Sequence, residues 1–114
     1  MHTQITARHF NATQTLREYT MQRLVKLERY YAGILNAHVI LEHMRLTSNN
    51  SVEISIHIQR NVIVARATAT KHTQAIDACI LQLQRQLIKY KGKVHQRRRP
   101  SPSELIGEDN DRID

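Results

Sequence analysis

Residues 52–58 read VEISIHI, and this strict alternation of apolar and polar residues decides the fold of the chain. Successive side chains of an extended strand point to opposite faces, so the pattern predicts one buried face and one wet face. The Arg60-Asn61 pair is expected to form a compact hairpin turn, and residues 62–70 (VIVARATAT) predict the next strand. Alanines alternate after Ile63 along one face of that strand, and such small side chains would let a helix approach closely.

Upstream of the hairpin, the sequence predicts a short strand followed by a helix. Residues 3–8 (TQITAR) alternate, and Asn11 or Thr13 can cap the helix because their side-chain oxygens accept from its first free N–H groups. Residues 15–31 carry apolar or core-compatible side chains at the helical spacing of three and four. This stripe consists of Leu16, Tyr19, Thr20, Leu24, Leu27 and Tyr31.

Between this helix and the alternating segment, the sequence predicts a stop, a strand and a turn. Gly33 is expected to end the helix, since glycine enters the left-handed conformation at little cost. Residues 36–45 (NAHVILEHMR) predict a strand, and residues 48–50 (SNN) predict a turn.

The last predicted element is an amphipathic helix in the segment AIDACILQLQRQLIKYKGKVHQRRR, residues 75–99. Its apolar stripe consists of Ile76, Cys79, Ile80, Leu83, Leu87 and Tyr90. The opposite side is expected to hold Ala78, Gln82, Arg85 and Lys89. Gly92 weakens the helical pattern, and Pro100 and Pro102 prevent any continuation.

The element order is therefore β-α-β-β-β-α, which predicts an α+β fold with a four-stranded sheet. The first crossover needs a parallel neighbour, and the hairpins are antiparallel. Both helices must bury their stripes, and one face of the sheet is the place to do so. The other face, with His57 and Arg66, is expected to stay wet. We expect one domain over residues 1–95, and a disordered tail, first basic and then acidic, over residues 96–114.

The charge of the chain indicates a polyanionic partner. The net charge is +7 and the isoelectric point is near 10.1, which favours a nucleic acid or an anionic membrane surface. The charge is uneven, because residues 1–99 hold 16 Lys/Arg and 5 Asp/Glu, whereas residues 100–114 carry Arg112 against five acidic residues. A plain alternative is that the basic surface serves solubility alone.

Other functional classes find little support in the residues. No apolar run is long enough to span a bilayer and no signal peptide is visible, and the single cysteine suits a reducing cytoplasm. His38 and His43 would point to opposite faces of their strand, and no Cys pair or His-x-x-x-His spacing exists, so no metal site is predicted. Cys79 lies on the apolar stripe and is interpreted as a core residue. We expect no cofactor and no enzymatic activity.

The order of elements and several motifs together resemble one known family. The motifs are RLVKLERY (23–30), LNAHVIL (35–41), AID (75–77) and RQLIKYK (85–91). They are similar to segments of the ribosome hibernation promoting factors, a family that includes the ribosome-associated translation inhibitor called protein Y. The similarity covers residues 1–95. Each motif is weak alone, and their specificity comes from their occurring together and in order.

The resemblance implies a cytoplasmic, non-enzymatic protein, monomeric when free, that binds the small ribosomal subunit, its 16S-type rRNA and the 70S ribosome. It implies binding in the decoding cleft, where the protein would block messenger and the A- and P-site tRNAs of idle ribosomes in stationary phase or under stress. It also implies a short form, because the second, dimerising domain of long members is absent. The chain departs from the family at Lys71-His72-Thr73, where an acidic and an aromatic residue are replaced.

A physical reading of the two helices agrees with this implication. Each Lys or Arg that meets a phosphate releases counterions, which gives strong and salt-sensitive binding. Side by side, the outer helix faces would form a basic surface roughly 20 Å across. The resemblance implies RNA contacts by Arg8, Arg23, Lys26, Arg85, Lys89 and Lys91, which stand where the family has basic residues. The charge pattern adds to the predicted RNA-binding residues Arg29, Lys71, Lys93, Arg97, Arg98 and Arg99. The plain alternative for Arg85 and Lys89 is a solvated helix face, and for residues 97–99 it is a nonspecific basic tail. Arg23 could simply snorkel beside the core.

Two other functions stay open at this point. The chain could be a free RNA-binding module of the double-stranded type, whose αβββα order also occurs here. It could also be an interaction protein whose basic face docks on an acidic partner. The acidic segment 100–114 could be a solubilising appendage, could screen the basic face, or could lie in the messenger path.

Overall fold

The computed structural model describes the backbone of residues 1–98 and the side chains of residues 1–91. Its elements are β1 (His2–Arg8), α1 (Gln14–Tyr30), β2 (Ile34–Met44), β3 (Asn49–Ile58), β4 (Asn61–Ala69) and α2 (His72–Arg98). The predicted order β-α-β-β-β-α is confirmed. The predicted RNA contact Arg99 and the acidic segment 100–114 lie outside the described residues.

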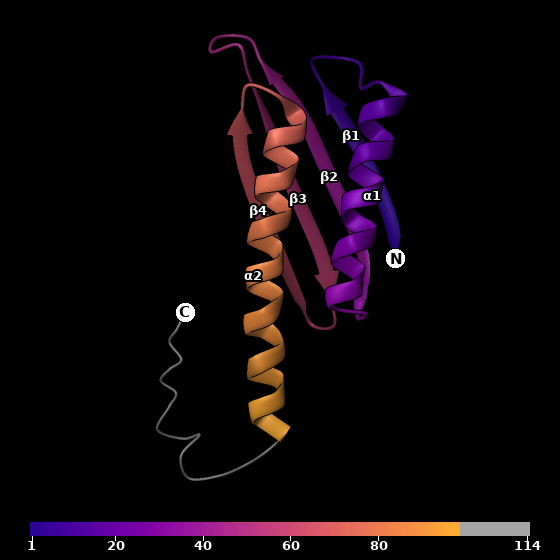
Figure 1. Cartoon of the computed structure of the whole chain (residues 1–114), viewed down its shortest axis with the longest axis vertical. Helices are drawn as coiled ribbons and strands as arrows, with labels where there is room; N and C mark the ends of the chain where they lie inside the picture. Colours follow the sequence, from indigo (N-terminus) through magenta and orange to yellow (C-terminus); the bar gives the residue numbers. More distant parts are fainter. Residues whose placement is uncertain (99–114) are drawn as a thin grey trace.

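The sheet is mixed and has the strand order β1-β2-β3-β4. β1 pairs with β2 in parallel, whereas β2, β3 and β4 form two antiparallel pairs. Both helices cover the same face of the sheet, with α1 toward β1 and β2 and α2 toward β3 and β4 (Figure 1). They run in the same direction, because each returns from the end of a strand that points toward the upper end of the molecule. The upper end is the top of Figure 1, where both helices begin.

The core lies between the helices and the covered face of the sheet. Paired positions from neighbouring strands point to the same side, and the alternation of residues 52–58 places its apolar members inward. The strands contribute the buried residues Ala37, Val39, Leu41, Val52, Ile54, Ile56, Ile58, Ile63 and Ala65. The helices contribute Leu24 and Leu27 from α1, and Ala75, Ile76, Cys79, Ile80, Leu83 and Leu87 from α2. Burying each large aliphatic side chain contributes about 1.5–3 kcal/mol, so this layer carries most of the stability.

Helix α2 packs against the face of β4 that carries the small alanine side chains, as the sequence predicted. Ala65 is buried, and Ala67 and Ala69 are partly buried against the same core. The flank of α2 also closes the outer edge of β4, because the side-chain amides of Gln82 and Gln86 donate to the carbonyls of Arg66 and Val64 at 3.0 and 3.1 Å. The prediction that Gln82 lies opposite the apolar stripe is therefore wrong: it lies beside the sheet edge.

The start of α1 agrees with the sequence, but its end has a different physical basis. The Thr13 hydroxyl accepts from the amide of Leu16 at 3.1 Å, so Thr13 is the N-cap. The helix ends at Tyr30, and Tyr31 continues in an extended conformation. The prediction that Gly33 stops the helix in the left-handed conformation is wrong, since no glycine in the described part of the chain has a positive φ. Gly33 instead provides space, because an added Cβ would lie 2.6 Å from Cε2 of Tyr31.

Both predicted hairpin turns are displaced by a few residues. The first turn spans residues 45–48 and ends at Ser48, which has a φ of 59°, whereas Asn49 and Asn50 already belong to β3. The second loop consists of Gln59 and Arg60, with Arg60 at a φ of 64°. Asn61 pairs with Ile58 and opens β4. In both cases, residues that open the following strand were predicted to belong to the turn.

Candidate nucleic-acid interface

Five of the predicted RNA-binding cations lie exposed on the two helices, and four of them have no bonded partner among the described side chains. Lys26 and Arg29 belong to α1, and Arg85 and Lys89 belong to α2. Among residues 1–91, whose side chains are described, none of the four forms an ion pair or donates a side-chain hydrogen bond to a neighbour. We call these four residues the four-cation surface. Their charges are free to meet an external anion.

The spacing of residues along each helix places these cations relative to the seam between the helices. Tyr19, Arg23, Lys26 and Tyr30 follow one another at steps of four and three, so Lys26 continues the row of α1 that faces α2. On α2, Lys89 follows Gln86 by one turn and shares its flank beside β4. Lys26 therefore lies beside the seam, whereas Lys89 lies on the flank of α2 beside β4.

Apolar side chains lie among the same cations. Val25 on α1 is 45% exposed, and Leu81 and Ile88 on α2 are 48% and 58% exposed. Leu81 and Ile88 flank Arg85 at helical spacing. The surface is thus a mixture of positive charge, which suits phosphates, and aliphatic area.

Arg23, also predicted to bind RNA, is already bound within the protein. Its Nε lies 3.2 Å from Oδ1 of Asp77, and its Nη2 donates to the Tyr19 hydroxyl at 3.0 Å. The guanidinium carbon also lies 4.8 Å from the centre of the Tyr19 ring. The hydrogen bond to Tyr19 raises the pKa of Arg23 above its ordinary value, and burial, followed by the bond to Asp77, raises the pKa of Tyr19.

Lys91 lies at the other end of the seam and serves to hold the helices together. Its Nζ donates to the carbonyl of Tyr30 at 3.1 Å, which satisfies a carbonyl at the end of α1. Next to it, Tyr90 packs edge-on against Tyr31 with ring centres 5.7 Å apart, and its hydroxyl donates to the carbonyl of Gln59 at 3.2 Å. A role of Lys91 in RNA binding stays a prediction.

Two further predicted contacts lie away from the four-cation surface. Arg8 pairs in register with Glu42, at a position of β1 that points to the sheet face not covered by helices. Lys71 is exposed at the upper end, just before α2. The helices therefore do not gather all the predicted cations on one surface. Lys93, Arg97 and Arg98 lie on the described backbone of α2, whereas their side chains lie outside the described part of the structure.

The face of the sheet that carries no helix, here called the open face, bonds several of its polar side chains to one another. Arg66 Nε lies 3.2 Å from Oε1 of Glu53 on the neighbouring strand. His38 forms a hydrogen bond of 3.1 Å with the Thr6 hydroxyl, and His57 is exposed. The prediction that this face is wet and carries His57 and Arg66 is confirmed.

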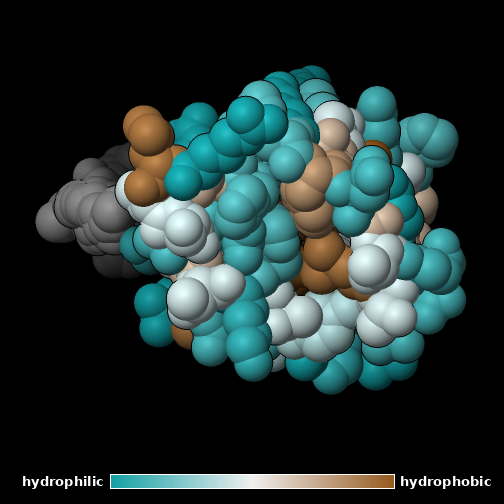
Figure 2. Space-filling view, turned by 90° about the horizontal axis from the view of Figure 1, so that it is seen from above, coloured by the Kyte–Doolittle hydropathy of each residue, from teal (hydrophilic) through white to brown (hydrophobic). Residues whose placement is uncertain are grey.

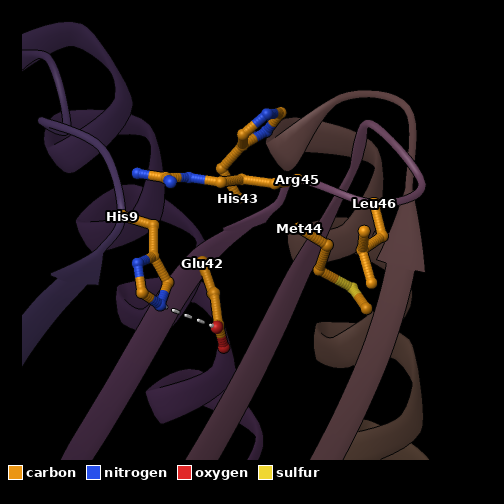
Figure 3. Close-up of a pocket in the computed structure, with 6 residues that line it drawn as sticks. All are labelled: His9, Glu42, His43, Met44, Arg45 and Leu46. Atoms are coloured by element: carbon orange, nitrogen blue, oxygen red, sulfur yellow. Dashed lines mark ion pairs between the residues drawn. The ribbon is translucent and has the colours of Figure 1, made fainter.

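A hollow of about 420 Å³ lies at the upper end, beside the end of β2. Its lining residues are His9, Glu42, His43, Met44, Arg45 and Leu46 (Figure 3). His9 Nε2 lies 3.5 Å from Oε2 of Glu42, and Met44 and Leu46 provide apolar area on the other side. Seen from above, hydrophobic atoms appear in a hollow of this otherwise largely hydrophilic end (Figure 2). None of the predicted RNA-binding residues lines this hollow.

The described residues also bear on the metal, membrane and cysteine predictions. Within the part of the chain that the structure describes, no three His, Cys, Asp or Glu residues come together as a metal site would require. Neither of its helices combines the length and the apolar character needed to cross a bilayer. Burial raises the pKa of the Cys79 thiol to about 12, and its Sγ lies 3.4 Å from the carbonyl of Val52, so it acts as a protonated core residue.

Sequence reasoning missed the network that joins the two helices near their upper ends. The spacing of Tyr19 and Arg23 by four residues was visible and is typical of interacting pairs on a helix. The contact of both with Asp77 depends on how the helices pack, and nothing local in the sequence signals it. The exposed apolar residues were missed because they do not break the helical pattern of the buried stripe.

The fold and the four-cation surface define a small α+β protein with a helical surface suited to a polyanion such as RNA. Residues 3–95 match the family model described as Sigma 54 modulation protein / S30EA ribosomal protein. The chain belongs to this family. That membership supports the prediction that the chain is not an enzyme, since the family description is that of a modulation and ribosomal protein.

Proteins of assigned function are similar in sequence to this chain over most of its length. The ribosome hibernation promoting factor of Pseudomonas putida is 34% identical over 93 residues, which cover 82% of this chain and 89% of that protein. The protein of the same name from Escherichia coli K12 is 32% identical over 96 residues, with 84% and 99% coverage. The resemblance to hibernation promoting factors is thereby confirmed.

Solved structures agree with the fold. A ribosomal subunit interface protein from Coxiella burnetii is 27% identical with a TM-score of 0.74, and the match covers 81% of this chain and 99% of that one. The N-terminal domain of Thermus thermophilus protein Y, at 23% identity and a TM-score of 0.72, covers 79% and 99% and shares the fold.

Proposed function

We propose that this protein is a ribosome hibernation factor that binds the small ribosomal subunit through the four-cation surface. The bound protein occupies the decoding cleft, contacts the 16S-type rRNA and blocks messenger and the A- and P-site tRNAs. The proposal places the protein in the cytoplasm, as a monomer that acts on idle ribosomes. Support comes from relatives named ribosome hibernation promoting factor that align over most of their length.

The single observation that carries this proposal is that four helix cations have no partner within the described side chains. Lys26, Arg29, Arg85 and Lys89 are exposed and unpaired, whereas Arg66 of the open face and Arg23 and Lys91 of the seam are bonded to other groups. A cation without an internal partner breaks no bond within the protein when it meets a phosphate. Each such contact releases counterions, so four of them provide a substantial and salt-dependent free energy of binding.

The direct test reverses two of these charges and measures binding to ribosomes. Arg85→Glu with Lys89→Glu should reduce co-sedimentation with purified small subunits at least about tenfold at near-physiological salt, because two phosphate contacts become repulsions. The same variant should fail to inhibit cell-free translation at concentrations where the unaltered protein does.

A matched control removes the same amount of charge elsewhere. Arg45→Glu with Arg60→Glu alters two exposed loop residues at opposite ends of the sheet. This control should keep most of the binding and inhibition. Full inhibition of translation by the Arg85→Glu, Lys89→Glu protein would show that these helix cations are not part of the mechanism. Equal losses of binding in both variants would show that affinity depends on net charge alone.

The alternative of a free double-stranded-RNA module is tested in the same experiment. The leading strand β1, parallel to β2, adds an element to the αβββα order that this alternative rests on. A generic RNA duplex added in excess should displace the protein from subunits only weakly if it recognises the ribosome. Complete displacement by an equimolar amount of duplex would favour the free RNA-binding module.

A further inference from the structure

The upper part of the seam between α1 and α2 is closed by three polar side chains that bond to one another. The Tyr19 hydroxyl lies 2.7 and 2.8 Å from the two carboxylate oxygens of Asp77, to which it donates its proton. Arg23 Nε lies 3.2 Å from Oδ1 of the same carboxylate, and Arg23 Nη2 donates to the Tyr19 hydroxyl at 3.0 Å. Each of the three groups thus contacts the other two.

This network is accessible from outside. The side chain of Arg23 is 33% exposed and that of Asp77 is 50% exposed. Asp77 is also the single acidic residue within α2, His72–Arg98, a helix otherwise rich in Lys and Arg. A phosphate that approached Arg23 would therefore come close to a carboxylate of like charge. The positive charge of Arg23 is neutralised at the place where RNA would meet it.

The lower part of the same surface lacks such a carboxylate. Lys26 follows Arg23 by one turn on the row that faces α2, and no described acidic side chain pairs with it. Two neighbouring cations of α1 thus differ in availability, although both have the spacing expected of RNA contacts.

We propose that Asp77 is a positioning residue that withholds Arg23 from phosphate and so confines RNA to the four-cation surface. The inference rests on the proposed function and deepens it, because it says which part of the helices the RNA backbone follows. Asp77 acts through its charge: it repels phosphate from the upper seam and thereby sets where along the helices the RNA lies.

The test compares salt dependences of binding to a generic RNA duplex of about two helical turns, followed by fluorescence anisotropy. Each phosphate contact adds about 0.9 to the slope of log affinity against log salt, or roughly threefold between 50 and 200 mM salt. Asp77→Asn keeps the shape and can still accept from Tyr19, but it frees the charge of Arg23. Its slope should steepen by about 0.9.

A matched control separates this effect from a simple change in net charge. Glu18 is an exposed carboxylate of α1 whose hydrogen bond comes from Gln14, not from a cation. Glu18→Gln removes the same charge without releasing an arginine, so its slope should stay unchanged. Equal steepening in Glu18→Gln and Asp77→Asn would overturn the proposal.

A second pair of variants keeps the proposal testable even if Asp77→Asn unfolds. Arg23→Gln should leave the slope unchanged, because Arg23 makes no phosphate contact in the unaltered protein. Lys26→Gln, one turn away, should reduce the slope by about 0.9. A reduction of the slope in Arg23→Gln as large as that in Lys26→Gln would show that Arg23 binds phosphate despite Asp77, and it would refute the proposal.

These readings are independent of the ribosome experiment. A protein that does not sediment with small subunits, but whose duplex slopes behave as described, would refute the proposed function and support the role of Asp77. A protein that inhibits translation, but whose slopes do not distinguish Arg23 from Lys26, would refute the role of Asp77 alone. A purely structural role of Asp77 predicts a lower melting temperature with an unchanged slope, which would also contradict the proposal.

Discussion

The two outer faces of the molecule both carry cations, but they differ in how these cations are paired. On the open face of the sheet, Arg66 is paired with Glu53, and Arg8 lies in register beside Glu42. On the helix side, the four-cation surface has no ion pair among the described side chains. The comparison teaches that the availability of a charge, and not its presence, distinguishes a binding surface from a solvated one.

The largest expected difference between the two sides of the sheet is in stability. Leu83→Ala removes a fully buried side chain from between α2 and the sheet, so it should lower the free energy of unfolding by about 2–5 kcal/mol. Val64→Ala, at a partly exposed position of the open face, should lower it by less than about 1 kcal/mol. Urea denaturation measures both values. Equal losses would mean that the open face contributes to the core as much as the covered face.

The next largest effect concerns RNA affinity. The salt dependence is expressed as the affinity at 50 mM salt divided by the affinity at 200 mM salt. Replacing all four residues of the four-cation surface by glutamine should reduce this ratio by about 100-fold, since four phosphate contacts are lost. The measurement is fluorescence anisotropy with an RNA duplex at several salt concentrations.

A quadruple control variant sharpens this comparison between the faces. It replaces by glutamine four arginines that are not among the predicted RNA-binding residues: Arg17, Arg45, Arg60 and Arg66. Both variants lose the same charge, so a much smaller change in the control is expected. If the control loses as much salt dependence, affinity follows total charge and the distinction between the faces is wrong.

A smaller effect is expected where the helix side meets the sheet edge. Gln82→Ala and Gln86→Ala each remove a hydrogen bond to a carbonyl of β4, and each should lower the free energy of unfolding by about 0.5–1 kcal/mol. Gln84→Ala on the same helix is the control, because Gln84 forms no such bond and the gain in helix propensity is the same. Thermal melts followed by circular dichroism measure these losses of stability. Equal melting temperatures of the three variants would contradict a role for these amides.

The smallest effect is a pH dependence at the upper end. His72 stacks on Phe10 with ring centres 4.6 Å apart, and its Nε2 lies 3.2 Å from the Glu42 carbonyl. Burial lowers the pKa of His72 below its ordinary value, so the unfolded chain takes up the proton first on acidification. This part of the stability is complete above about pH 6.5 and is lost as the pH falls toward the lower, folded-state pKa.

The measurement is the melting temperature at pH 7 and pH 5. His72→Gln should reduce the difference between the two temperatures, whereas His57→Gln, at an exposed position of the open face, should leave it unchanged. Identical pH dependence in His72→Gln and the unaltered protein would assign the effect to other groups.

Much of the fold could be predicted because it depends on local periodicity. The alternation over residues 52–58 and the stripe from Ile76 to Tyr90 each report burial directly, and both predictions are confirmed. The turns were displaced because Asn, Ser and Arg tolerate both turns and strand ends. The prediction for Gly33 was wrong because its requirement for space arises from a neighbouring ring, which the left-handed rule for glycine does not consider.

The candidate site was harder to predict than the fold. The sequence identified which cations lie on helices, and Lys26, Arg29, Arg85 and Lys89 are exposed there. It could not show that Arg23 is held by Asp77 or Lys91 by Tyr30, because both contacts join residues far apart in the chain. The position of Arg8 on the open face follows from the alternation of residues 3–8, in which Ile5 and Ala7 lie on the opposite side.

The tight contact at Gly33 has a consequence for how the sequence can change over time. Any side chain at this position would displace the Tyr31 ring, whose Cε2 lies 2.6 Å from the place of an added Cβ. That ring packs edge-on against Tyr90, so its displacement would disturb α2 as well as the end of α1. We therefore expect positions 31, 33 and 90 to vary together among descendants of this chain. Where the glycine at position 33 is lost, a side chain smaller than tyrosine should accompany the change at position 31 or 90.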